Sequence, residues 1–159
     1  SRWNGRYRRS LYERGLPFLV DHPLGATLTV RREAAQEVGL LDERFFMYCE
    51  EIDWCRRIKA AGWQVYCVPQ AEVVHLSGRS TRQSREAMFV ALWRSRYLLF
   101  AKHNGRLYRR AVRLVVAAGL AREAARVRRD LRQGRLDPAA AERRLSALRE
   151  VRKLGRDLA

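Results

Sequence analysis

The long helical pattern of the second half is the feature that most limits how this chain can fold. Apolar residues recur at helical spacing from Ser84 onward, and proline occurs only once in that stretch. The dipeptide Asn-Gly at 104–105 and then Gly134 are turn or stop signals within it. We therefore expect one helix over 84–103 and a second over 107–133.

The last part of the sequence carries helix signals of its own. Asp137 is suited to cap a helix N-terminus, Pro138 to occupy the first helical position, and Gly155 to end the helix. Between these limits, apolar residues recur at a spacing of three, at Leu145, Leu148, Val151 and Leu154. Such a narrow apolar stripe predicts packing on a neighbouring helix.

The positive charge of the chain is concentrated in this helical half. Lys and Arg number 33, against 17 Asp and Glu. Residues 1–80 hold 12 basic and 10 acidic residues, whereas 81–159 hold 21 basic and 7 acidic ones. An excess of +14 in one half favours a polyanionic neighbour, which is either an anionic membrane surface or nucleic acid.

The basic tail allows several interpretations. Apolar and aromatic side chains share its helices with arginines, which suits the headgroup boundary of an anionic bilayer. The same pattern suits helices that pack on a folded domain, and both can hold together. A nucleic-acid-binding module and a non-catalytic partner-binding scaffold are the alternatives, although no RNP, zinc-finger or helix-turn-helix signature is present. No apolar run approaches the ~20 residues of a spanning helix.

The first half mixes short strand and helix signals. β-Branched or alternating stretches predict strands over 25–30, 63–68 and 71–76. Helices are expected over 31–38 and 50–61, and each is followed by a glycine that can end it. This half is therefore predicted to be a mixed α/β piece.

The cysteines are odd in number and lack the spacing of a metal site. We interpret Cys49, Cys55 and Cys67 as reduced thiols in a cytosolic compartment. Packing explains them better than a role as catalytic nucleophiles.

Three carboxylates within four residues open the helix expected over 50–61. They are Glu50, Glu51 and Asp53. Acidic side chains at a helix N-terminus ordinarily complement the helix dipole. The aromatic run just before them supports a second interpretation, in which a carboxylate lies at the floor of a pocket and acts as a general base.

A histidine, His75, lies near the end of the last predicted strand and is followed by Ser-Gly-Arg-Ser. A lone histidine in such a place is usually structural. With a polar loop after it, the imidazole can instead be a metal ligand whose neighbouring loop contacts phosphate.

Taken in order, residues 23–80 resemble the C-terminal half of family 2 glycosyltransferases. The segments that carry the resemblance are GATLTVRR, FFMYCEEIDWCRR, AGWQV and VVHLSGRS. The likeness is strongest to bacterial rhamnosyltransferase-type members that build cell-envelope glycans, and 94–105 shares it more loosely. It implies an α/β fold class, with the acceptor-side, C-terminal portion of a GT-A (Rossmann-like) catalytic domain over 1–80 and a basic helical tail over 81–159.

The resemblance also implies residues on the donor side of a site. Those that would border the donor sugar are Gly25, Ala26, Arg31 and Arg32, and those in a loop over the donor are Gly78, Arg79 and Ser80. His75 would help to hold Mg²⁺ or Mn²⁺ on the donor diphosphate.

On the acceptor side, the resemblance makes Glu51 the catalytic base. Family members commonly have Asp at this position, so the choice among Glu50, Glu51 and Asp53 stays open. Asp53 would otherwise orient the acceptor or the base.

Family members bind the nucleotide through an N-terminal half with an Asp-x-Asp motif, which this chain lacks. The chain also begins without Met, so we expect a fragment that is inactive alone. The implied reaction is metal-assisted, inverting transfer of a sugar from a nucleotide-sugar donor to a lipid-linked or cell-envelope glycan. We expect the enzyme in the cytoplasm, peripheral on the inner face of the plasma membrane, and expect no nucleic acid partner.

Overall fold

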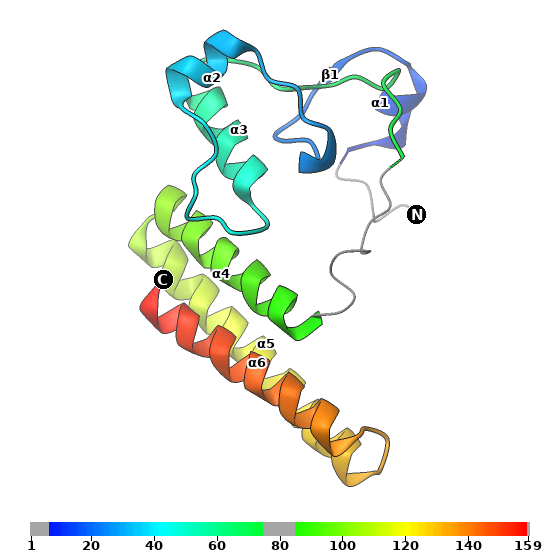
Figure 1. The fold of residues 1–159 in the computed structure, drawn as a ribbon, viewed down its shortest axis with the longest axis vertical. Helices are drawn as coiled ribbons and strands as arrows, with labels where there is room; N and C mark the ends of the chain where they lie inside the picture. The colour runs from blue at the N-terminus through cyan, green and yellow to red at the C-terminus, as the bar shows by residue number, and fades with distance from the viewer. Residues whose placement is uncertain (1–6, 75–84, 159) are drawn as a thin grey trace. The chain divides into compact units, whose positions relative to one another are not determined.

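A computed structural model of the chain describes residues 7–74 and 85–158 (Figure 1). The chain forms two compact units. Unit 1 comprises Ser1–Glu43 and Glu50–Ser77, and unit 2 comprises Arg44–Cys49 and Gly78–Ala159. Within the described ranges, no helix combines the length and apolar character needed to cross a membrane.

Unit 1 consists of short elements joined by loops. In chain order they are α1 (Arg9–Glu13), β1 (Phe18–Leu19), the 3-10 turn η1 (Gly25–Thr27), α2 (Arg32–Val38), α3 (Glu50–Ala60) and β2 (Tyr66–Cys67). The strands pair antiparallel, with Phe18 opposite Cys67 and Leu19 opposite Tyr66. One further hydrogen bond, from Val20 N to Val65 O at 2.9 Å, extends the pairing.

The core of unit 1 lies beneath the apolar side of α3. Cys55 and Ile58 of that helix are buried together with Val20 and Val65 from the strand segments. Partly buried side chains complete this cluster: Tyr7, Phe18, Leu28, Val30, Val38, Trp54, Trp63 and Cys67. The apolar spacing of α3 therefore fixes which of its sides turns inward.

The helices of unit 1 agree with the sequence, whereas most predicted strands do not. The helices α2 and α3 confirm the two predictions, and Gly39 and Gly62 follow them with φ of 76° and 90°. The strand predicted over 25–30 is wrong, because 25–27 forms η1 and 28–30 pairs with nothing described. β2 is shorter than predicted, and 71–74 carries no strand.

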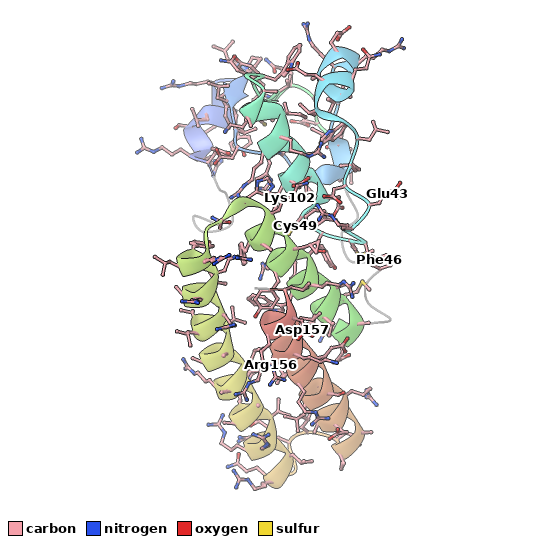
Figure 2. All side chains as sticks on the ribbon, turned by 90° about the vertical axis from the view of Figure 1, so that its left-hand side faces the viewer. Glu43, Phe46, Cys49, Lys102, Arg156 and Asp157 are labelled. Carbon is pink, nitrogen blue, oxygen red and sulfur yellow. The ribbon has the colours of Figure 1, made fainter. Side chains whose placement is uncertain are left out.

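Unit 2 is largely a three-helix assembly. Its helices are α4 (Arg85–His103), α5 (Arg106–Arg132) and α6 (Pro138–Asp157), and α6 packs against both of the others. The sequence predictions for all three helices are confirmed within one to three residues at their described ends. In Figure 2 the blue nitrogen ends of side chains project outward along α5.

The core of unit 2 draws on all three helices. Its buried members are Tyr97 from α4, Leu120 from α5, and Leu148 and Val151 from α6. Leu145 and Leu154 pack against this cluster, so the predicted stripe on α6 is confirmed as a helix-packing surface.

The two ends of α6 bear out one sequence signal and contradict another. Asp137 caps the helix by accepting a hydrogen bond from Ala140 N at 2.8 Å, and Pro138 takes the first position. Gly155 was expected to end the helix, and this is wrong because α6 continues to Asp157. Gly155 is instead buried against Tyr97, where an added Cβ would lie 2.7 Å from the phenol oxygen and 2.9 Å from Cζ.

We predict that Gly155→Ala destabilises the protein by ~1–3 kcal/mol, because the fully buried Tyr97 ring has to shift to admit a methyl group. Gly119→Ala is the matched control, since a Cβ there meets nothing within 4 Å. In α5 that change should instead stabilise the helix by ~0.5–1 kcal/mol. Denaturant unfolding of both variants measures the difference. Equal stabilities would contradict a close helix crossing at Gly155.

Candidate active site

The three predicted carboxylates all lie in the first turn of α3. Their surroundings differ, because Asp53 is fully buried while Glu50 and Glu51 are partly exposed. A helix N-terminus favours negative charge near its free N–H groups, so the local backbone supports ionised side chains here. Asp53 therefore differs from Glu50 and Glu51 in being shielded from solvent.

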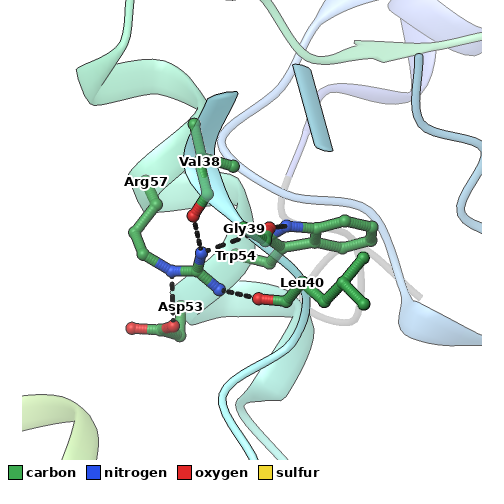
Figure 3. Close-up of polar contacts among 6 residues, drawn as sticks. All are labelled: Val38, Gly39, Leu40, Asp53, Trp54 and Arg57. Carbon is green, nitrogen blue, oxygen red and sulfur yellow. Dashed lines mark hydrogen bonds and ion pairs between the residues drawn. The ribbon is translucent and has the colours of Figure 1, made fainter. Parts of the chain in front are cut away.

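Asp53 is held by an arginine one turn along the same helix. Arg57 Nε donates to Asp53 Oδ2 at 3.0 Å, and the guanidinium side chain is 21% exposed. The same guanidinium also donates to the backbone carbonyls of Val38, Gly39 and Leu40, at the end of α2 (Figure 3). Asp53 is therefore an anchored carboxylate at the junction of two helices.

A tryptophan strengthens the same junction. Trp54 Nε1 donates to Gly39 O at 2.8 Å. The last carbonyls of a helix have no partner within the helix, so side-chain donors supplied from α3 satisfy them. Arg57 and Trp54 together fasten the C-terminus of α2 to the first two turns of α3.

Glu51 lies beside Gly25, which the resemblance placed at the border of the donor sugar. A Cβ added to Gly25 would lie 3.4 Å from Glu51 Cβ, 3.5 Å from Cγ and 3.6 Å from Cδ. Unit 1 therefore brings together two predicted site residues that are far apart in the sequence. Ala26 follows in the same 3-10 turn.

Glu50 presents a different chemistry. Its Oε2 atom is buried and has no hydrogen-bond partner among the described residues. A buried carboxylate oxygen without a donor is costly unless a ligand or water completes it. Glu50 is therefore the acid of the three whose buried oxygen has no described donor to offset the cost of burial.

The turn before these acids has an unusual backbone. Tyr48 and Cys49 have φ of 70° and 68°, in the left-handed region that non-glycine residues seldom adopt. Within unit 2, Ser95 Oγ of α4 donates to Met47 O at 2.6 Å, and Phe45 is buried. Strained backbone of this kind persists where the surrounding structure holds it, and such positions cluster at functional sites.

The cysteines are packing residues, as predicted. The three cysteines, all among the described residues, form no disulfide, and Cys55 is fully buried in the core of unit 1. Burial raises the pKa of the Cys55 thiol, and the negative charge of Glu51 raises it further, whereas Lys59 acts in the opposite direction. A thiol held protonated in this way is a poor nucleophile.

The predicted donor-side arginines lie at the start of α2. Arg31 precedes the helix, Arg32 is its first residue, and both are exposed. Arg31 also borders a cavity of about 500 Å³ between the start of α2, α3 and the β2 segment. Its lining is mainly apolar and includes Cys55 and Ile58, but none of the three carboxylates. The acids and this cavity are separate features of unit 1.

The remaining predicted site residues, His75, Gly78, Arg79 and Ser80, lie outside the described residues. In the described part, no three His, Cys, Asp or Glu side chains come together as metal ligands would. The described residues thus do not by themselves fit a Mg²⁺ or Mn²⁺ centre, and its assignment to His75 stays a prediction.

Comparison with characterised proteins gives a consistent set of relatives. The chain is 34% identical over 138 residues to N-acetylglucosaminyl-diphospho-decaprenol L-rhamnosyltransferase of Mycobacterium tuberculosis, a match that covers 84% of the chain. It is homologous to glycosyltransferases. Shorter matches are to rhamnosyltransferase WbbL of Escherichia coli, 34% identical over 64 residues and 24% of that protein, and to the hexosyltransferase Agl10 of Haloferax volcanii, 30% identical over 56 residues and 18% of that protein.

The match also limits what this chain represents. It covers 43% of the mycobacterial relative, so the chain spans less than half the length of that protein. No protein-family model matches the chain, and no solved structure matches it. The relationship to sugar transferases is therefore shown by sequence, and the family 2 assignment stays a prediction.

We predict that Arg57→Ala lowers the free energy of unfolding by ~3 kcal/mol, because it leaves the buried Asp53 carboxylate without its guanidinium. Arg56→Ala is the matched control, since it removes the same charge from an exposed neighbouring position and should change stability by less than ~0.5 kcal/mol. Arg57→Lys should fall between them, because an ammonium cannot bond all these acceptors at once. Denaturant unfolding checks all three variants.

Proposed function

We propose that this chain forms the acceptor side of an inverting, family 2-like glycosyltransferase with a GT-A catalytic domain. The homology to the mycobacterial rhamnosyltransferase over 84% of the chain is the observation that carries the proposal. The clustered acids at the start of α3, with Gly25 beside Glu51, support it. The donor is a nucleotide sugar and the acceptor is a glycan that is lipid-linked, as the name of that relative states for its own acceptor.

In this proposal a carboxylate of α3 accepts the proton of the acceptor hydroxyl. The oxygen attacks the anomeric carbon as the bond to the donor diphosphate breaks, and the nucleoside diphosphate leaves with the electron pair. A single displacement of this kind inverts the anomeric centre. A positioned base contributes roughly 10²–10⁴-fold to such a step.

The structure bears on which acid is the base. Asp53 is fully buried and its Oδ2 already accepts from Arg57, so it suits an orienting role. Glu51 is partly exposed beside Gly25, and Glu50 has the oxygen without a donor. We assign the proton of the acceptor hydroxyl to Glu51, and Glu50 is the alternative base.

We predict that Glu51→Gln lowers turnover of the full-length enzyme by ~10²-fold or more while leaving donor affinity unchanged. The carboxamide keeps the size of the side chain but cannot take up the proton. Glu43→Gln is the control, because Glu43 is an exposed acid outside α3 and its loss should leave turnover unchanged. Normal turnover for Glu51→Gln together with a large loss for Glu50→Gln would move the base to Glu50.

A divalent cation, Mg²⁺ or Mn²⁺, belongs to the proposal as the group that stabilises the departing diphosphate. His75 would contribute one ligand, with the others supplied outside the described residues. We predict that His75→Ala weakens donor affinity and raises the cation concentration needed for half-maximal activity. An unchanged cation titration would return His75 to a structural role.

The enzyme is proposed to work at the cytoplasmic face of the plasma membrane. The excess of +14 over residues 81–159 supports this, as does a lipid-linked acceptor.

A further inference from the structure

One side of α5 is exposed along the whole length of the helix. Leu120 and Val127 on its opposite side are buried in the core of unit 2. The exposed positions recur at intervals of three and four residues, so they form one continuous stripe. This outer face of α5 consists of Leu107, Ala111, Leu114, Val115, Ala118, Arg122, Ala125, Arg129 and Arg132.

The outer face of α5 has two chemically different halves. The first half carries three large apolar side chains that are largely in solvent: Leu107 is 81% exposed, Leu114 68% and Val115 72%. The second half is basic, and its arginines line a groove together with Gly119, Glu123 and Ala125. The helix as a whole has nine arginines and two acids.

The two acids of α5 are already engaged by arginines. Glu123 accepts from Arg126 at 3.1 Å and from Arg144 of α6 at 3.3 Å. Asp130 accepts from Arg135 at 2.8 Å, and that hydrogen bond lowers the pKa of Asp130.

Glu123 lines the same groove as the arginines, and Arg129 of the outer face lies 3.7 Å from Asp130, so these acids offset part of the charge. Among the described residues, Arg122 and Arg132 form no ion pair, so their charges are available to an external group.

We propose that the outer face of α5 is a docking surface for an anionic lipid bilayer. The helix would lie in the plane of the headgroups, with the apolar half at the acyl boundary and the arginines on lipid phosphates. Interfacial helices bind through apolar side chains that enter the headgroup–acyl boundary and through basic side chains that meet anionic headgroups, and the outer face of α5 supplies both kinds. Each arginine near an anionic surface adds attraction, and burial of exposed Leu and Val side chains adds an apolar contribution.

Charge and chemistry favour an anionic bilayer over a second copy of the chain and over duplex nucleic acid as the occupant of this face. A second copy of the chain would bring the same arginines against this face, and the acid that lines the groove, Glu123, is already engaged by Arg126 and Arg144. Duplex nucleic acid would satisfy the arginines but would leave Leu107, Leu114 and Val115 in water. An anionic bilayer accommodates both halves.

The proposal rests on α5 and not on the sugar-transfer reaction. It is therefore tested by binding of the full protein to vesicles without donor or acceptor. Phosphatidylcholine vesicles with and without phosphatidylglycerol are the probes, and co-sedimentation is the readout. The parent should bind the anionic vesicles far more tightly than the neutral ones. Equal binding to the two kinds of vesicle would overturn the proposal.

Two double variants test the two halves of the face separately. Arg122→Gln with Arg132→Gln should weaken binding to the anionic vesicles by ~25-fold, at roughly fivefold per arginine. Leu114→Ser with Val115→Ser should weaken it by ~10-fold or more at unchanged charge. All four side chains are exposed, so both variants should unfold at the parent's temperature. Parent-like binding by either variant would be evidence against the face.

The matched control removes two charges from exposed positions of α6. Arg143→Gln with Lys153→Gln should stay within about threefold of the parent, because those charges lie away from the docking face. A loss as large as that of the α5 arginine variant would show attraction by total charge alone and overturn the proposal. The proposal would also be overturned if the parent protein were a dimer that the Leu114→Ser and Val115→Ser changes dissociate. Duplex DNA binding that depends only on the arginines would overturn it as well.

Discussion

The guanidinium of Arg57 is shared between a buried carboxylate and the end of a neighbouring helix. Burying the Asp53 charge costs several kcal/mol, which an arginine can offset only with close, well-aligned hydrogen bonds. The same group bonds the carbonyls of Val38, Gly39 and Leu40, so α2 and α3 cannot move independently. The position of the α3 carboxylates relative to the end of α2 therefore depends on Arg57, together with the Trp54 bond to Gly39.

This arrangement gives different surroundings to three acids that look equivalent in the sequence. Asp53 is fully buried and stabilises the junction through Arg57. Glu50 and Glu51 keep exposed or uncommitted oxygens at the helix N-terminus. The left-handed conformation of Tyr48 and Cys49 brings the chain into the helix abruptly, and such strain is maintained only where its surroundings require it.

In unit 2, the two sides of the long helix α5 also differ in their roles. The buried side of α5 contributes Leu120 to the core that contains Tyr97, and Val127 on the same side is also buried. The close approach of α6 to the Tyr97 ring depends on the missing Cβ of Gly155. The two acids of α5, Glu123 and Asp130, form ion pairs with Arg126, Arg135 and Arg144. The stripe left in solvent is therefore apolar in one half and basic in the other, which gives the helix a surface with its own chemistry.

The sequence alone determined the helices, the cap at Asp137, the packing stripe on α6, the acidic start of α3 and the relationship to sugar transferases. Helix signals are local, because a helix satisfies its backbone within one segment and shows its inward side by spacing. The strand predicted over 25–30 failed because a strand needs a partner, and the described part of unit 1 provides none. Arg57 and Gly155 were misjudged or missed for a similar reason. A basic residue after an acid has no distinctive pattern, and a glycine near a helix end has the same local pattern whether it stops the helix or packs against a ring. Only the tertiary structure decided which carbonyls lay within reach of Arg57 and which ring lay against Gly155.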